Sequence, residues 1–302
     1  MTKLNKTHSV SNDASLVKKR NFNAVSFFFK IIINTLKNGG VFKFLLMSKE
    51  AKFFFFIINN FIPIVENNGL LFYGLFKIPY SRGKTLMTKE PEMISFIEDH
   101  VNEGEVYYDI GANIGVFSLY AAKNKMANVI SFEPESSNYF ILNKNILLNK
   151  LSERVVAYCI AINDVNEISK INLKDAITPG KSGNTFKDKI NQDHERFKPM
   201  FEQGSFGMSL DDFVFVYGNK CPDHVKIDVD GNEHHVINGM NRIMQDGSLK
   251  TIAIEINTML TESNHLIKII EQKGYERVFG YRNEAYEKIG VINYFFKKTI
   301  LS

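Results

Sequence analysis

The chain has 302 residues, of which 44% are hydrophobic, 13% aromatic and 23% charged, so it is not disordered throughout and can form one large globular domain with an appendage. Its two cysteines, Cys159 and Cys221, have no Cys or His at metal-ligand spacing, which argues against a disulfide framework and a structural zinc site and fits a reducing compartment. Residues 1–62 contain ten Lys and Arg and two acidic residues, a net charge of +8, so the formal charge of +4 leaves −4 on the other 240 residues. Because this larger part is mildly acidic, we expect no nucleic-acid partner.

The N-terminal segment is both basic and aromatic, with eleven of the 26 phenylalanines before residue 63. Residues 22–62 predict amphipathic helices that end before Pro63. Lysines interrupt every apolar run long enough to span a membrane, and no small-residue cleavage site follows the first apolar stretch. We therefore expect a cytoplasmic protein with a helical extension at residues 1–66. Residues 22–62 either contact the inner membrane face peripherally or pack on the following domain or on a second subunit.

Residues 67–302 alternate predicted strands and helices. Seven strands are expected, at residues 106–110, 129–132, 155–160, 224–229, 251–256, 275–279 and 291–296. Helices are expected at residues 116–123, 136–149, from about 233, and at 261–273. The last two strands are too close together for a crossover helix, and a polar stretch between 171 and 208 predicts a surface excursion. The pattern predicts a mostly parallel, seven-stranded Rossmann-like α/β sheet with one antiparallel strand and helices on both faces.

The strongest functional signal is the turn after the first of these strands. Asp109 ends the strand, and Gly111 and Gly115 allow a tight turn and the close approach of a ligand to the following helix N-terminus. Glu133, at the end of the second strand, is placed to accept hydrogen bonds from a ribose diol. The two acids together suggest an adenosine ligand. The turn taken alone is also compatible with a structural junction in which Asp109 caps the helix.

The spacing of the glycines distinguishes between adenosine ligands. A nicotinamide fold typically has G-x-G-x-x-G around the pyrophosphate, whereas Gly111 and Gly115 form Gly-x-x-x-Gly. Asp109 would repel a pyrophosphate but suits the ammonium and sulfonium charges of S-adenosylmethionine. A nicotinamide-dependent oxidoreductase on a Rossmann-like fold and a non-catalytic membrane-associated scaffold remain the alternatives.

Two further acids follow the strand at 224–229. Asp228 and Asp230 share one face and reach the carboxyl edge of the sheet, where ligands of open α/β folds bind, so they are the predicted catalytic residues. Either one acts as the general base or orients the acceptor. Lys226 lies on the same face and needs a carboxylate partner. For Lys226 and Glu233, a structural ion pair is at least as compatible with the sequence as a catalytic role.

Three other polar residues have open roles. Glu255, in an apolar strand, either works with Asp228 as a general base or helps to bind a divalent cation, and no metal ligand is assigned. Asn163, after the third strand, either contacts adenine or belongs to a turn. Ser209 either caps a helix or touches the acceptor.

Four sequence blocks, in this order, resemble those of FkbM-type methyltransferases. They are Asp109-Ile-Gly-Ala-Asn-Ile-Gly115, Phe132-Glu133-Pro134, Ser209-Leu-Asp-Asp-Phe213 and Val225-Lys-Ile-Asp-Val-Asp-Gly-Asn-Glu233, within a resemblance from about Lys77 to Lys297. The resemblance implies a Rossmann-like class I methyltransferase with S-adenosylmethionine as donor and a hydroxyl acceptor on a small molecule, sugar or glycoconjugate precursor. The chain has Asp230 where the family more often has Glu. The residues expected to bind the cofactor are Asp109, Gly111, Asn113, Gly115, Glu133 and Asn163.

Overall fold

The computed structural model describes residues 63–174, 178–189, 195–259, 261–279, 283–284 and 290–299. One folded unit begins at Pro63, before the boundary at residue 67 that the sequence suggested. The helices predicted within residues 22–62 lie outside the described residues. Within the described part, no helix combines the length and the apolar character needed to cross a membrane.

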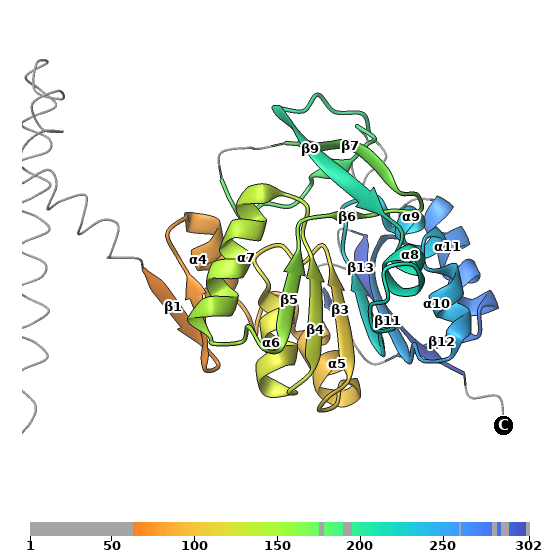
Figure 1. Ribbon diagram of the computed structural model, residues 1–302, viewed down its shortest axis with the longest axis horizontal. Coiled ribbons are helices and arrows are strands. Elements are labelled where there is room, and N and C mark those ends of the chain that lie inside the picture. The colour runs from red at the N-terminus through yellow and green to blue at the C-terminus, as the bar shows by residue number, and fades with distance from the viewer. Residues whose placement is uncertain are drawn as a thin grey trace, which may run out of the picture. The chain divides into compact units, whose positions relative to one another are not determined.

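A seven-stranded sheet forms the centre of this unit (Figure 1). Its strands are β3 (Val106–Ile110), β4 (Asn128–Phe132), β5 (Val155–Tyr158), β10 (His224–Ile227), β11 (Thr251–Asn257), β12 (Tyr275–Arg277) and β13 (Val291–Lys298). They lie in the order β12-β13-β11-β10-β3-β4-β5, and only β13 runs antiparallel to its neighbours. The predicted sheet with one antiparallel strand is therefore confirmed. The third, fourth and sixth strands end two residues earlier than the sequence pattern suggested.

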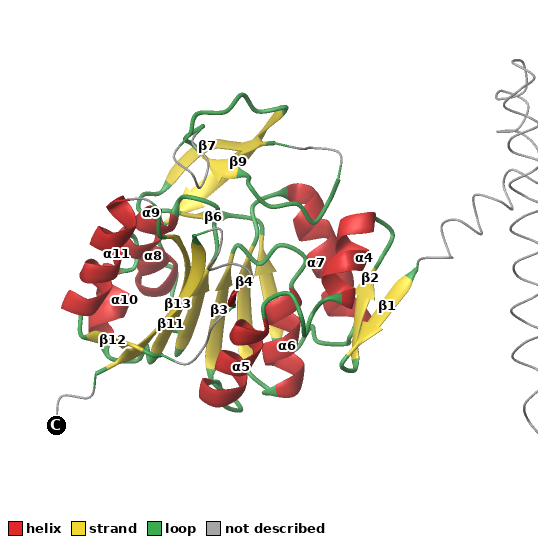
Figure 2. Cartoon of the chain, turned by 180° about the vertical axis from the view of Figure 1, so that it is seen from behind, coloured by secondary structure: helices red, strands yellow, loops and turns green. Residues whose placement is uncertain are grey.

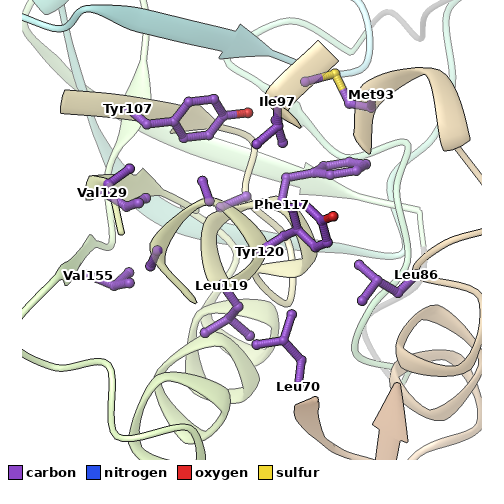
Figure 3. Packing of buried hydrophobic residues seen from close by; sticks show 14 of the residues in the cluster. Leu70, Leu86, Met93, Ile97, Tyr107, Phe117, Leu119, Tyr120, Val129 and Val155 are labelled. Atoms are coloured by element: carbon purple, nitrogen blue, oxygen red, sulfur yellow. The ribbon is translucent and has the colours of Figure 1, made fainter. Parts of the chain in front are cut away.

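Helices cover both faces of the sheet because successive side chains of a strand point to opposite sides. One face carries α5 (Pro91–His100), α6 (Val116–Asn124) and α7 (Ser136–Leu148), and the other carries α8 (Leu210–Phe215), α9 (Glu233–Asn238), α10 (Asn241–Asp246) and α11 (Thr261–Gln272) (Figure 2). Tyr107 of β3 and Val129 of β4 belong to the first core, whereas Tyr108 and Ile110 of β3 belong to the second. Figure 3 shows Tyr107 and Val129 among the buried side chains of the first core. Burial on both faces explains why β3 contains no exposed residue.

A hairpin and a short helix precede the central sheet. Strands β1 (Ile64–Asn67) and β2 (Leu70–Tyr73) pair antiparallel and are followed by α4 (Lys77–Lys84). The hairpin is attached to α7, because Asn145 Oδ1 accepts a hydrogen bond from the N–H of Tyr73 at 2.7 Å. Helix α4 lies tightly on β2, since a Cβ at Gly83 would stand 2.7 Å from the Cβ of Phe72. Helix α4 is linked to the first turn of α7 through Gly180, whose backbone oxygen accepts a hydrogen bond from Arg82 Nε and whose N–H donates one to Asn138 Oδ1.

The excursion between the two halves of the chain forms a second, smaller sheet. Its strands are β6 (Ala161–Ile162), β7 (Glu167–Leu173), β8 (Thr185–Phe186) and β9 (Phe201–Met208), in the order β6-β9-β7-β8. This sheet lies beyond the carboxyl ends of β3, β4 and β5 (Figure 1). Its own core consists of Ala161, Ile171, Leu173 and Phe186. The small sheet thus covers the carboxyl edge of the central sheet, where ligands of open α/β folds bind.

Candidate active site

A cleft lies between the carboxyl edge of the central sheet and the small sheet. It encloses about 690 Å³, partly open to solvent, which is within the range of small-molecule sites. Side chains from the β4, β5 and small-sheet side are largely apolar: Phe132, Pro134, Ile160, Ile162, Ile171 and Phe186. The polar and charged part of the lining is Arg82, Asn113, Glu133, Glu135, Asn138, Lys181, Ser182, Asn184, Asp228, Asp230 and Asn232. The cleft therefore offers both an apolar wall and a strongly charged wall to one ligand.

The turn after β3 forms part of the floor. Gly111 lines the cleft at φ +76°, and a Cβ there would stand 1.8 Å from the backbone oxygen of Asp228. Asn113, at φ 52°, also lines the cleft. Gly115 precedes α6 and packs on α7, because a Cβ there would stand 2.3 Å from Leu142 Cδ1. Of the two predicted glycines, Gly111 faces the cleft and Gly115 sets the packing of two helices behind it.

Glu133 forms the adjoining wall at the end of β4. Its Oε2 accepts a hydrogen bond from the N–H of Asn113 at 2.7 Å, and its Oε1 accepts one from the N–H of Glu135 at 3.0 Å. Burial raises the pKa of Glu133 to about 7, against the lowering effect of these two bonds. The carboxyl group is therefore fixed in one position at the surface of the cleft, where it can accept further hydrogen bonds from a ligand.

Asp109 lies behind the cleft and does not line it. Its side chain is fully buried, with Oδ1 3.3 Å from Lys226 Nζ and Oδ2 accepting a hydrogen bond from Ser118 Oγ at 2.5 Å. Lys226 and Asp109 are neighbours because their positions pair in register between β10 and β3. The carboxylate partner expected for Lys226 is thus Asp109 together with Asp228, whereas Glu233 accepts a hydrogen bond from the N–H of Gly231.

The two predicted catalytic acids both line the cleft but differ electrostatically. Burial acts to raise the pKa of Asp228, but the positive charge of Lys226, 3.1 Å away, together with those of Lys89 and Arg82, outweighs it and holds this pKa below its ordinary value. Burial, with the charge of Asp228, raises the pKa of Asp230 to about 6. Asp230 has a positive φ of 56°, and its Oδ2 accepts a hydrogen bond from the N–H of Gly183 at 2.6 Å. Two neighbouring carboxyl groups with separated pKa values are typical of acid–base sites.

Glu255 lies next to this pair, because Ile254 pairs with Ile227, the last residue of β10. Burial and then the charge of Asp228 raise the pKa of Glu255 to about 9. Glu255 is therefore protonated at neutral pH and cannot serve as a general base there. In the described ranges, no three His, Cys, Asp or Glu side chains are arranged to hold a metal ion.

Two other candidates have structural contacts away from the cleft. Asn163, directly after β6, is buried and does not line the cleft; its Nδ2 donates a hydrogen bond to Glu167 Oε1 at 3.3 Å. Ser209 precedes α8, and its Oγ accepts a hydrogen bond from the N–H of Asp212 at 3.1 Å. Ser209 is therefore the helix cap that its spacing from Asp212 allowed.

Residues 178–184 also form part of the cleft, which the sequence analysis did not predict. The Asn113 Nδ2 donates to the Lys181 backbone oxygen at 3.1 Å, and the N–H of Gly183 bonds to Asp230. The N–H of Gly180 donates to Asn138 Oδ1 at 2.6 Å. The segment is thus attached to both sides of the cleft. Its glycine-rich composition was visible as a turn signal, but composition does not indicate which distant side chains a turn meets.

The strand order, the glycine turn after β3 and the acids at the ends of β4 and β10 define a Rossmann-like fold of the class I methyltransferase type. Residues 109–277, more than half of the chain, match the model of the methyltransferase FkbM domain. The chain belongs to this family of methyltransferases, and its cofactor is S-adenosylmethionine.

No curated protein matches the chain. Among solved structures, it is similar to TYW2 from M. jannaschii in complex with AdoMet, with 18% identity over 78% of this chain and 86% of that chain and a TM-score of 0.41. A precorrin-6y C5,15-methyltransferase from Geobacter metallireducens is 14% identical over 72% of this chain and 92% of that chain, with a TM-score of 0.40. An rRNA methylase from Streptococcus thermophilus is 10% identical over 68% and 94% of the two chains, with a TM-score of 0.42.

Proposed function

We propose that the protein transfers the methyl group of S-adenosylmethionine to a hydroxyl group of a sugar or glycoconjugate precursor. The observation that carries this proposal is the position of Asp230 in the wall of the cleft, with a pKa of about 6 produced by burial and by Asp228. A hydroxyl acceptor must lose its proton as the new bond forms, and a carboxylate with this pKa is suited to accept it near neutral pH.

The lining of the cleft fits the cofactor in both shape and chemistry. The apolar wall with Phe132 and Ile162 suits an adenine ring, and Glu133 suits the ribose diol. Gly111, which has no side chain, and Asn113 would lie beside the amino-acid portion. Asp109 and Gly115 support these residues from behind the lining in this proposal, whereas Asn163 makes its contacts away from the cleft. The bound cofactor supplies a methyl group activated by its positively charged sulfur.

The catalytic work of the chain itself is positioning and proton acceptance. Asp228 stays ionised because Lys226 pairs with it, and its negative charge raises the pKa of Asp230. Asp230 then receives the proton of the acceptor hydroxyl at its carboxylate. In this proposal, the small sheet and the 178–184 segment, whose Gly183 N–H bonds to Asp230, limit the access of water and hold the acceptor in line with the donor.

The acceptor class can be tested directly. Purified protein is incubated with S-adenosylmethionine and an extract of native glycans and lipid-linked precursors, and products are analysed by mass spectrometry. We expect a gain of one methylene unit on a hydroxyl oxygen, dependent on the donor and strongly reduced in Asp230→Asn. Methylation found only on nitrogen, carbon or nucleic acid would contradict the proposal.

The basic, phenylalanine-rich residues 22–62 support a cytoplasmic location with peripheral contact to the inner membrane face, where a lipid-linked acceptor would be found. In this proposal, residues 1–66 act as the extension and residues 67–302 as the methyltransferase domain. Cosedimentation with anionic liposomes tests the contact. We expect the full-length protein to sediment at low salt and a deletion of residues 1–62 to remain in solution. Failure of the full-length protein to sediment would contradict membrane contact.

A further inference from the structure

The lining of the cleft contains more acidic than basic side chains. Among the described residues of its lining, four are acidic and two are basic: Glu133, Glu135, Asp228 and Asp230 against Arg82 and Lys181. S-adenosylmethionine carries one anionic group, the carboxylate of its amino-acid portion. In an acidic cleft this carboxylate needs a cationic partner, because burying an unpaired charge is costly.

Arg82 is positioned to meet this need. It is half-buried in α4, lines the cleft, and donates a hydrogen bond from Nε to the Gly180 backbone oxygen at 2.6 Å. This bond orients the guanidinium while its two terminal nitrogens retain the fork that binds carboxylates with two parallel hydrogen bonds. Gly180 packs closely against α4, because a Cβ at Gly180 would stand 3.0 Å from both Ile78 and Pro79.

The charge of Arg82 acts at the end of the cleft formed by β10. Burial is the main cause that raises the pKa of Asp230 and Asp228 adds to it, while the N–H of Gly183 and then Arg82 act in the opposite direction. Arg82 also contributes, after Lys226 and Lys89, to lowering the pKa of Asp228. This end lies across β3 from the apolar wall of the cleft, because β10 and β4 flank β3 on opposite sides.

Lys181, the other basic residue of the lining, is less suited to bind the cofactor carboxylate. Its backbone oxygen accepts hydrogen bonds from Asn113 Nδ2 at 3.1 Å and from Asn138 Nδ2 at 3.3 Å, which place the residue near the β3 turn and the first turn of α7. Its ammonium group is a point charge on a flexible chain, so it does not present the planar fork of an arginine.

We propose that Arg82 binds the carboxylate of S-adenosylmethionine and that the 178–184 segment orients its guanidinium through Gly180. This inference rests on the proposed function of the cleft and deepens it. Arg82 lies before residue 109, outside the part of the chain that matches the family model, so α4 completes a site that the matched part does not contain by itself.

Two adenosine ligands separate this role from general damage to the cleft. S-adenosylhomocysteine carries the amino-acid carboxylate, and 5′-methylthioadenosine lacks the amino-acid portion. Calorimetry on the full-length protein should show that Arg82→Ala weakens binding of S-adenosylhomocysteine by roughly 10- to 100-fold, the range of a hydrogen bond to a charged group. Binding of 5′-methylthioadenosine should stay within about 2-fold. Arg82→Gln, which keeps a donor for the Gly180 oxygen, should show the same selective loss.

Lys84→Ala is the matched control, because Lys84 is an exposed cation on the same helix and does not line the cleft. It should bind both ligands as the unmodified protein does. Unchanged affinity of both Arg82 variants for S-adenosylhomocysteine would overturn the inference, as would an equal loss for both ligands. If the unmodified protein binds neither ligand, the proposed function fails together with the inference. If Arg82→Ala does not fold, the affinities of Arg82→Gln for the two ligands test the inference.

Discussion

Lys226 and Asp228 are two positions apart in the chain, and Lys226 Nζ lies 3.1 Å from Asp228 Oδ2. The same ammonium group lies 3.3 Å from Asp109 Oδ1, so one buried cation links the ends of β10 and β3. Asp109 and Asp228 were both predicted to act in the site, but their positions relative to Lys226 and the cleft give them different roles. Asp109 stays behind the cleft, and Asp228 is held ionised at its surface.

Lys226→Met should strongly destabilise the protein, because it leaves the buried carboxyl group of Asp109 without its cation. We expect the free energy of unfolding in urea to fall by about 3–5 kcal/mol, as when one partner of a buried ion pair is removed. Lys170→Met is the control, since Lys170 pairs with Glu202 on the surface and should leave stability nearly unchanged. Equal effects of the two substitutions would contradict the structural role of Lys226.

Glu133→Gln should weaken cofactor binding without the selectivity expected for Arg82. Glu133 is proposed to bind the ribose diol, which S-adenosylhomocysteine and 5′-methylthioadenosine share. Both affinities should therefore fall by about 10-fold or more in calorimetry. Loss of affinity for only one of the two ligands would show that Glu133 does not contact the ribose.

Asp230→Asn should lower turnover by about 100-fold or more while leaving the affinity for S-adenosylhomocysteine nearly intact, as expected for loss of a general base. Asp230→Glu keeps the carboxylate and should retain much of the activity. In the unmodified protein the rate should rise with pH through about 6, because Asp230 must lose its proton to accept another. A rate independent of pH between about 5 and 8 would argue against Asp230 as the base.

Glu255→Gln should make stability less sensitive to pH. The pKa of Glu255 rises from 4.5 to about 9 on burial, so the folded chain holds this proton more tightly than the unfolded chain does. The free energy of unfolding contributed by this group therefore decreases as pH rises from about 4.5 toward 9. Gln mimics the protonated acid and removes this loss.

Urea unfolding at two pH values tests this expectation. Glu255→Gln should gain stability relative to the unmodified protein on going from pH of about 5 to about 8. Glu153→Gln, an exposed acid, should show no such gain. If the difference in free energy of unfolding between Glu255→Gln and the unmodified protein does not change with pH, Glu255 is not protonated in the folded protein.

The sequence by itself determined the architecture of the domain. The alternation of apolar strands and amphipathic helices predicted the parallel sheet, and the short connection before residues 291–296 predicted the antiparallel strand. Gly111, Glu133, Asp228 and Asp230 were placed at the carboxyl edge by their positions after strands. These inferences succeed because periodicity and strand ends are local signals.

Only the tertiary structure decided which of these groups share contacts and which other segments join them. Arg82 and Gly180 are bonded although 98 residues separate them in the chain, and Asp230 bonds to Gly183 across 47 residues. The partner of Asp109 was equally hidden, because it depends on the register between β3 and β10. Such contacts result from the packing of whole elements, and local patterns of residue type carry no information about which distant segment arrives at a given edge.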